Sequence, residues 1–448
     1  MSTTTETEIE LQIPTTLPHR PTSRSPGHEP DPDSAFVTTA IPNGGYGWTI
    51  VAACSLLTFW FNGLSGSWGV LQTALLSSSL PHTSASTISF VGSLALGCIV
   101  AFGLIGIRLM RWFGARTIAL LGVTLLGAGE IASGFTTSNI GGLFGTSGVL
   151  VGVGTCLLYG ASNMLPTQYF SSKLGLANGL VKLGGGLGAS ILSIVLEAFI
   201  RKVGIAWAFR ALGLLTLATG IPAACLIRER APIRDVPFIE LSMFRSPPFT
   251  AVFIAGALAT FALFVPPYFL PMFAQSIGLS SGTGAALVAG FNFCTAIGRF
   301  AAGPLCDAIG PVNMFLITML LNAVSMLAIW PASDTLGPLV LFAMLNGIAN
   351  GAFFTTMPTV VASMFGPGRA AVAMGMAITG WTGGYLMGAP IAGYLLQMAG
   401  GTEVGGGKGF GVGVYRPAIF YAGGVALAAS IFVLIARMRM ETKLIKRV

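Results

Sequence analysis

The amino-acid sequence predicts an all-α membrane protein with twelve transmembrane helices. Of its 448 residues, 53% are hydrophobic and 8% are charged, whereas a soluble domain carries roughly 25% charged residues. The apolar runs last about 20 residues, the length of a membrane-spanning helix, whereas the strands of a membrane barrel alternate over about 10. Because lipid offers the backbone no hydrogen bonds, such runs must fold as helices. Lipid is therefore the expected solvent for most of the chain.

Composition and residue placement exclude several classes of protein. The formal net charge of +8 would suit nucleic acid, but most basic residues fall in predicted cytosolic loops, so we expect no nucleic-acid partner. The cysteines lie in apolar segments and the histidines outside them, so no metal site, disulfide framework or cofactor is predicted. A membrane-embedded enzyme would need convergent His, Asp or Cys groups within the spans, so we expect no catalytic residues and no enzymatic activity.

The chain divides into a polar N-terminal tail, two groups of six spans and a charged linker. Residues 1–44 hold six of the fifteen acidic residues and cannot bury a core, which predicts a disordered tail in the cytosol. We assign 45–227 to an N-terminal six-helix bundle, 228–247 to a cytosolic linker, 248–437 to a C-terminal six-helix bundle and 438–448 to a cytosolic tail. The predicted spans lie near residues 47–70, 87–108, 116–136, 142–164, 175–200, 206–227, 249–272, 281–304, 312–331, 336–359, 370–397 and 416–437.

The distribution of lysine and arginine predicts the orientation of the chain. With the N-terminus in the cytosol, 16 of the 23 basic residues fall in inner segments and 4 in outer loops. Inner loops of membrane proteins are enriched in basic residues, so both termini should lie in the cytosol. We expect a multi-pass protein of the plasma membrane, with a vacuolar or other internal membrane as the alternative.

A weak internal repeat relates the two groups of spans. The segment from Leu109 to Gly114, after the second span, parallels the segment from Leu305 to Gly310, after the eighth. The same offset of 196 residues carries Gly184 to Gly380. Parallel repeats joined by a charged loop are typical of secondary transporters that move one repeat against the other around a central site.

Glycines and prolines within the predicted spans indicate close packing and kinks. Small residues four positions apart let helix backbones approach each other, and this spacing recurs in the fifth and eleventh spans. The predicted helix-packing residues are Gly184, Gly188, Gly380, Gly384 and Gly388. Prolines should kink the seventh, tenth and eleventh spans. They are Pro266, Pro267, Pro271, Pro358 and Pro390.

Two motifs resemble those of a known transporter family. Gly44-Gly-Tyr-Gly-Trp48 opens the first span, and Gly298-Arg299 and Gly303-Pro304-Leu305 with Asp307 close the eighth. Both resemble the monocarboxylate-porter family of the major facilitator superfamily, especially its fungal branch. The resemblance covers residues 43–437 and implies the major facilitator fold, in which two six-helix bundles move a small solute. It does not imply one substrate, because this branch includes carriers of short organic acids, vitamins and secondary metabolites.

The sequence departs from the family pattern in the loop that serves gating. The superfamily loop reads Gly-Pro-Leu-x-Asp-Arg-x-Gly, and in its first copy Arg108 and Arg111 replace the Pro and the Asp. Only the second copy keeps its acid, which is Asp307. We assign Arg111, Gly114, Asp307 and Gly310 to this gating motif, and any latch that uses a first-half Asp must be built differently here.

The residues that usually relay a proton are also replaced. Animal members of the family resemble a design with a Lys in the first span and an Asp four residues before the Arg of the eighth. Gly66 and Thr295 stand at those places here, so the usual relay is not carried over. Glu130 in the third span is the candidate for proton coupling, because a carboxyl group inside the membrane can carry a proton; the alternative is a Glu near water at the end of its span.

Arg299 is the leading candidate for contact with the substrate. A charge at bilayer depth costs at least ~2.5 kcal/mol on insertion scales, so it must face a cavity or a partner. A guanidinium fork suits a carboxylate, although Arg299 could instead pair with Asp307 or with helix ends to lock two helices. Lys182, about two turns into the fifth span, is the second basic candidate; alternatively, its amine extends to the inner surface.

Neutral polar and aromatic residues complete the candidate site. Asn62, Asn292 and Asn346 lie in the first, eighth and tenth spans, where each either lines a cavity or hydrogen-bonds between helices. Tyr385 and several tryptophans could wall an aromatic substrate or simply pack between helices. The tryptophans are Trp60, Trp68 and Trp381.

Together these features predict a secondary transporter that moves a small organic solute by alternating access. We expect a monocarboxylate or related organic anion as the substrate, with its carboxylate at Arg299. The alternatives are an exporter of a secondary metabolite, an uptake carrier for a neutral or aromatic vitamin-like compound, and a non-transporting membrane sensor. The sequence has no ATP-binding P-loop, so gradients must supply the energy, with a proton as the candidate co-substrate. We expect a monomer in the lipid bilayer.

Overall fold

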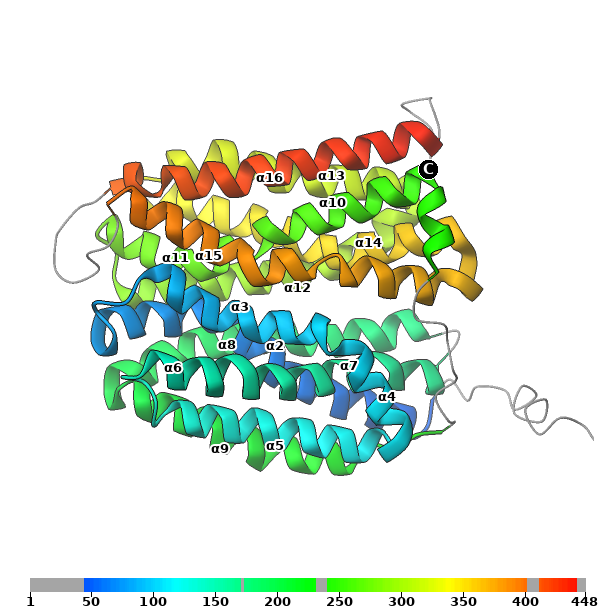
Figure 1. Cartoon of the computed structure of the whole chain (residues 1–448), viewed down its shortest axis with the longest axis horizontal. Coiled ribbons are helices and arrows are strands. Elements are labelled where there is room, and N and C mark those ends of the chain that lie inside the picture. Colours follow the sequence, from blue (N-terminus) through cyan, green and yellow to red (C-terminus); the bar gives the residue numbers. More distant parts are fainter. Residues whose placement is uncertain (1–43, 171–172, 231–239, 401–410, 441–448) are drawn as a thin grey trace, which may run out of the picture. The chain divides into compact units, whose positions relative to one another are not determined.

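The computed structural model describes residues 44–170, 173–230, 240–400 and 411–440, and within these ranges the chain is all-helical. Figure 1 shows long helices that run roughly alongside one another. Residues 231–239 of the predicted linker lie outside the described residues, as do almost all of the predicted N-terminal tail and residues 441–448 of the C-terminal tail.

The helices form two groups along the sequence. The N-terminal group comprises α2 (Gly47–Ala74), η1 (Leu75–Ser79), α3 (Ala85–Ala101), α4 (Gly103–Phe113), α5 (Ala115–Ser133), α6 (Ile140–Leu143), η2 (Phe144–Leu150), α7 (Val151–Tyr169), α8 (Leu174–Val203) and α9 (Ile205–Cys225). The C-terminal group comprises η3 (Leu241–Arg245), α10 (Pro247–Leu263), α11 (Val265–Ser276), α12 (Ser281–Ile309), α13 (Pro311–Val324), η4 (Ser325–Ile329), η5 (Trp330–Ala332), α14 (Leu336–Thr379), α15 (Thr382–Met398) and α16 (Gly411–Met440). Between the groups, α8 packs on α12, α3 on α15 and α2 on α11.

Ten of the described helical segments are long and apolar enough to cross a membrane, or 11 if the bent pair α3 and α4 is one span. Two of the twelve predicted spans account for the difference. The second span bends by 60° between α3 and α4. The eleventh is divided at Gly380 and Trp381, between the end of α14 and α15. The length of an apolar segment is therefore predictable from the sequence, whereas a break in the helix within that segment is not.

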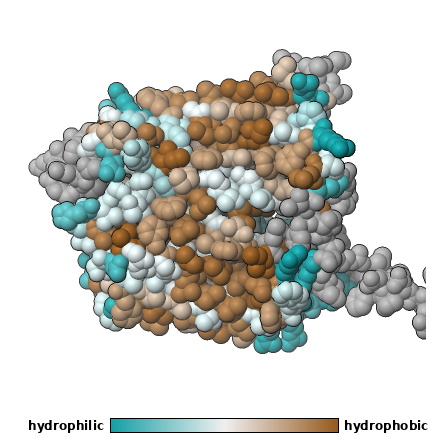
Figure 2. Space-filling model, viewed as in Figure 1, coloured by the Kyte–Doolittle hydropathy of each residue, from teal (hydrophilic) through white to brown (hydrophobic). Residues whose placement is uncertain are grey.

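The surface of the helical bundle fits a lipid environment. Hydrophobic residues cover the middle of the helices, and hydrophilic residues gather at the two ends (Figure 2). Phe300, Ile194 and Leu214 are 74%, 54% and 56% exposed. Monomeric soluble proteins rarely expose contiguous apolar surface of this kind, because water would drive its burial. The chain is therefore a multi-pass integral membrane protein.

The internal repeat is visible in the backbone. Gly114 and Gly310, which are 196 residues apart, have φ angles of +81° and +94° and precede α5 and α13. Gly204 and Gly400, separated by the same offset, have φ angles of +83° and +91° after α8 and α15. A side chain would strain the backbone at these angles, so both copies need glycine at the same turns.

Small residues bring α8 against α2 and α15 against α10. A Cβ atom added at Gly188 would lie 2.2 Å from the carbonyl oxygen of Phe59. In the second group, a Cβ atom added at Gly388 would lie 2.4 Å from the carbonyl oxygen of Phe261. Similarly close approaches occur at Gly184 and Gly384, whereas the nearest atom to a Cβ at Gly380 is a ring carbon of Phe253, at 2.7 Å. These backbones therefore approach to a distance that only glycine permits.

Prolines divide the seventh predicted span, and the break is stabilised by a neighbouring helix. α10 ends at Leu263 and α11 begins at Val265. Pro267 has no N–H group, so it cannot donate to the carbonyl of Leu263 one turn earlier. Asn350 of α14 donates from Nδ2 to this carbonyl over 2.6 Å. The freed backbone acceptor is thereby satisfied in a region where water is scarce.

Candidate substrate-binding site

A central cavity lies between the two groups of helices. Its walls come from α2, α3, α7 and α8 on one side and from α10, α11, α12, α14 and α15 on the other. The cavity volume is about 170 Å³, against the roughly 10–15 Å³ that a single bound water needs. A small organic molecule, rather than only solvent, is therefore the expected occupant.

Arg299 lines this cavity from α12. Its guanidinium carbon lies 4.9 Å from the centre of the Phe354 ring, which holds the cation by a cation–π contact. Within the described residues its Nε makes no hydrogen bond. Asp307, the partner considered from the sequence, is exposed near the end of α12, and the structure records no ion pair between the two side chains. Arg299 thus has donors to offer a ligand.

Lys182 lines the same cavity from α8. Its ammonium group donates a hydrogen bond to Oδ1 of Asn163 in α7. The same nitrogen lies 5.2 Å from the centre of the Tyr159 ring. Asn163 is itself fixed, because its Nδ2 donates to the carbonyl of Tyr159 over 2.7 Å. The amine is therefore held at the cavity wall by α7, and two of its three hydrogens are left for other acceptors.

The cavity is electropositive. Lys182 and Arg299 lie close enough to interact electrostatically. Among the described residues that line the cavity, none is Asp or Glu. Two positive charges that share an apolar cavity repel each other and attract anions, because the low dielectric strengthens both effects. The electrostatics of the cavity favour a negatively charged ligand.

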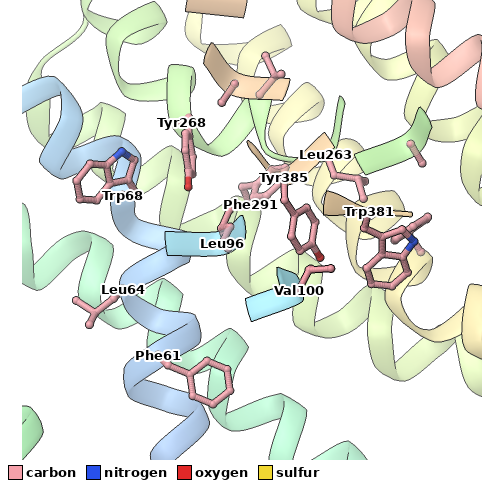
Figure 3. Packing of buried hydrophobic residues seen from close by; sticks show 14 of the residues in the cluster. Phe61, Leu64, Trp68, Leu96, Val100, Leu263, Tyr268, Phe291, Trp381 and Tyr385 are labelled. Carbon is pink, nitrogen blue, oxygen red and sulfur yellow. The ribbon is translucent and has the colours of Figure 1, made fainter. Parts of the chain in front are cut away.

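Aromatic side chains form much of the remaining wall. Tyr385 meets Phe264 edge to face at 5.1 Å, and Trp381 lies 6.0 Å from Tyr385. Figure 3 shows Tyr385 and Trp381 among the buried side chains near Leu96 and Val100, which also line the cavity. Aromatic rings prefer offset or edge-to-face contacts with other rings. This wall can therefore hold a flat, apolar body.

The three candidate asparagines occupy different environments. Asn62 and Asn292 line the cavity. Asn292 of α12 also donates to the carbonyl of Gly66 in α2 over 3.0 Å, which joins the two groups. Asn346 is fully buried away from the cavity lining. Its Nδ2 donates to Asn322 and Ser325, so it links α14 to α13 and η4.

The structure explains why the usual lysine of the first span is replaced at Gly66. A Cβ atom there would lie 2.6 Å from Cβ of Ala189 and 3.0 Å from Oδ1 of Asn292. No long side chain fits at this contact. Thr295, which replaces the usual Asp, lines the cavity and donates its hydroxyl to the carbonyls of Phe291 and Gly347. The second cation of the cavity comes instead from Lys182.

Three other candidates lie outside the cavity lining. Trp60 donates to the hydroxyl of Thr219 in α9 over 2.7 Å, and Trp68 is buried in the core of the bundle. Glu130 is 3% exposed in α5, a helix that packs on α7 and α9. Its Oε2 makes no hydrogen bond with any described residue. If Glu130 takes part in proton coupling, its effect must therefore reach the cavity through the contacts of α5 with α7 and α9.

The gating motif differs between the two copies. Asp307 is exposed near the end of α12, just before Gly310. In the first copy, Arg111 lies in the last turn of α4 before Gly114. The carboxylate at that turn is supplied by Glu229, after α9, which accepts a hydrogen bond from the backbone of Ala115 at the start of α5. A carboxylate near a helix N-terminus interacts favourably with the helix dipole. Glu229 therefore provides the negative charge that the first copy of the loop lacks.

Hydrogen bonds join the two groups of helices at one end of the bundle. We call the end where α2 begins and α9 ends the base; there the Tyr46 hydroxyl donates to the carbonyl of Leu226. Towards the opposite far end, Ser86 donates to the carbonyl of Pro390 over 2.7 Å, and Ser281 donates to Glu197 over 2.9 Å. Both hydrogen bonds join the N-terminal group to the C-terminal group.

Three of the contact-making residues at the site were not singled out from the sequence. They are Asn163, Tyr159 and Phe354. The signal for Asn163 was present, because a polar amide in an apolar span obeys the same rule that identified Asn62. Tyr159 and Phe354 carry no such signal, since aromatic residues are common in spans and only the fold places them beside a cation.

The fold and the electropositive central cavity define a membrane carrier. The sequence profile of the Major Facilitator Superfamily matches residues 48–290 and 252–447. The chain belongs to this superfamily of transporters. The MFS transporter asaE of Aspergillus flavus is 27% identical over 420 residues, which cover 93% of this chain and 91% of the relative. The aspyridones efflux protein apdF of Emericella nidulans is 28% identical over 404 residues, which cover 90% of this chain and 79% of the relative.

Solved structures share the fold at low sequence identity. The nucleoside transporter NupG matches with a TM-score of 0.70 and 14% identity, over 86% of this chain and 99% of that chain. A bacterial homologue of the human lysosomal transporter Spinster, in an inward-facing and unoccupied conformation, matches with a TM-score of 0.64 and 16% identity, over 88% of this chain and 97% of that chain. At this level of identity, the likeness to these solved structures shows a shared fold and no more.

Proposed function

We propose that the protein is a secondary carrier of small organic anions whose carboxylate binds Arg299. The observation that carries this proposal is a central cavity with two cationic side chains, Arg299 and Lys182, and no acidic residue in its described lining. Buried charge is costly unless it is paired, so an anion is the ligand that compensates this cavity best. A guanidinium fork binds both oxygens of a carboxylate, which favours the monocarboxylate-porter branch of the superfamily.

The proposed cycle is alternating access, in which the two groups of helices move about the cavity. Its support is the pair of hydrogen bonds that join the groups at the far end, which must break if that end opens. With both termini in the cytosol, the base faces the cytosol, and we propose that these far-end contacts close the outer side of the carrier. We further propose that the protein acts as a monomer in the plasma membrane.

The proposal is tested by flux through the purified protein in liposomes. Labelled lactate, benzoate and their neutral amides are supplied, with Arg299→Ala and Arg299→Lys beside the wild type. Arg416→Ala serves as the control, because Arg416 is exposed and does not line the cavity. We expect anion flux that is lost in Arg299→Ala, weakened in Arg299→Lys and retained in the control. Equal flux of the amides, or full activity of a folded Arg299→Ala protein, would overturn the proposal.

A second candidate is export of an aromatic secondary metabolite. It is favoured by the aromatic wall around Tyr385 and Trp381, and by relatives that are named as efflux proteins for aspyridones and agnestins. The two candidates differ in the ligand they require. If a neutral aromatic compound moves faster than any anion, and Trp381→Ala reduces this flux more than Arg299→Ala does, the aromatic wall rather than the cations defines the substrate.

A further inference from the structure

In the proposed anion carrier, two cations lie on opposite sides of the interface between α8 and α12, which we call the seam. α8 and α12 run antiparallel, since Gly186 faces Ala296 in the middle of the seam and Glu197 meets Ser281 at its far end. Lys182 lies four residues before Gly186, and Arg299 lies three residues after Ala296. At 1.5 Å per residue, Lys182 lies about 6 Å and Arg299 about 4.5 Å along the helix axis from that contact, on the same side towards the base. They therefore lie at nearly the same depth, one on each group of helices.

Each cation is held by its own group and keeps donors for a ligand. Lys182 is fixed by Asn163 and Tyr159 of α7. Arg299 is fixed over Phe354 of α14. The three supporting side chains all come from the same group as the cation they hold. The two positive charges are thus held by different groups of helices, although they share one cavity and interact electrostatically.

A single carboxylate carries one negative charge, so it cannot compensate both cations. Its oxygens can accept hydrogen bonds from Arg299 and Lys182 together, because each oxygen has two lone pairs. One of the two positive charges would nevertheless remain without a compensating anion in an apolar cavity, at a cost. A second acidic group on the same ligand would remove this cost. The aromatic rings of the cavity wall, including Tyr385 and Trp381, fit a flat body that carries the two groups.

From these contacts we infer that the substrate is a planar, aromatic acid with two anionic groups, one bound by Arg299 and the other by Lys182. The inference rests on the proposed function and narrows it to a substrate class. Lys182 is then a specificity-determining residue, which selects dianions over monoanions. The bound ligand connects α8 to α12, so it touches both groups of helices at once.

The inference is tested by ligand-induced thermal stabilisation and by flux of the purified, full-length protein. The probes are benzoate, terephthalate, isophthalate and monomethyl terephthalate, which has the same ring and only one charge. The variants are Lys182→Met, which keeps the length and removes the charge, and Lys182→Arg, which keeps the charge. Thermal unfolding without ligand shows that each variant is folded.

We expect a dicarboxylate to bind the wild type about tenfold to a hundredfold more tightly than its monoester, the range that one hydrogen bond to a charged group supplies. Lys182→Met should lower the affinity for the diacid far more than the affinity for the monoester, so that the preference is lost, whereas Lys182→Arg should keep the preference. Equal affinity of the wild type for diacid and monoester would overturn the inference while the anion carrier stands. An equal loss of affinity for the diacid and the monoester in a folded Lys182→Met protein would also overturn the inference. Failure of every anion to bind would overturn the proposed function itself.

Discussion

Ser281, at the start of α12, donates a hydrogen bond of 2.9 Å to Glu197 near the end of α8. The two side chains belong to different groups of helices and close the far end of the seam that continues to Lys182 and Arg299. If the protein works by alternating access, this contact must break whenever the far end opens. Each side chain offers a position at which that motion can be stopped.

A reversible cross-link between these positions should arrest transport. We expect the double variant Glu197→Cys with Ser281→Cys, bridged by a short bis-methanethiosulfonate reagent that forms a disulfide with each cysteine, to fall to about a tenth of its flux or less, because the far end can no longer open. Reduction should restore the flux. Each single variant and the treated wild type are the controls, since five of the six native cysteines are buried. Undiminished flux in the cross-linked protein would argue against opening at this end.

Substitution of Asn163 by Asp should remove the preference for dianions while Lys182 is left intact. Asn163 already accepts the hydrogen bond of the Lys182 ammonium, so a carboxylate there would compensate its charge without a ligand. We expect Asn163→Asp to weaken binding of terephthalate about tenfold or more and to leave its monoester almost unaffected. Thermal stabilisation by the two ligands measures this. Asn163→Ala, which removes the contact without adding charge, should change both affinities by less.

Gly188 should tolerate no side chain, whereas Gly179 of the same helix should tolerate one. A Cβ atom at Gly188 would meet the carbonyl oxygen of Phe59 at 2.2 Å, and nothing lies within 4 Å of one at Gly179. We expect Gly188→Ala to destabilise the protein by about 1–3 kcal/mol, because α2 and α8 must separate. Gly179→Ala should be neutral, or stabilising by up to about 1 kcal/mol through its helix propensity. Thermal unfolding in detergent compares them, and equal stability would contradict the packing.

Replacement of Glu130 by Gln tests the proposed proton coupling. Glu130 is buried in α5 away from the cavity, so its loss should leave ligand binding unchanged. If its carboxyl group carries the coupled proton, Glu130→Gln should lose accumulation driven by a pH gradient and keep the exchange of labelled for unlabelled anion. Both fluxes are measured in the same liposomes. Accumulation at the wild-type level would assign the proton to another group.

The spans were predictable from the sequence because every helix that crosses lipid must be apolar over about 20 residues. The fifth span, expected near 175–200, forms α8 at Leu174–Val203, since apolar length and flanking polar residues determine its ends. The break of the eleventh span at Gly380 and Trp381 was missed. At this break Gly380 packs against Phe253 of α10, a contact between helices that the local sequence pattern does not reveal.

The candidate site was predictable to the extent that charge inside lipid is rare. That rule alone selected Arg299 and Lys182, and the structure brings both to one cavity. The separate rule for neutral polar residues selected Asn346, which lies elsewhere, because an amide in a span serves helix contacts as readily as ligands. The supporting residue Phe354 could not be selected, since its role depends on which helix faces Arg299.

The like charges of Lys182 and Arg299 also bear on what the empty carrier can do. Closing the base without a ligand would bring two cations together in a water-poor interior, where their repulsion is strongest. An anion between them removes this repulsion, so the loaded protein should reorient faster than the empty one. Unlabelled anion on the opposite side of the membrane should then accelerate the release of labelled anion. One-for-one exchange, rather than net flow, is the mode of operation that this pair of charges favours.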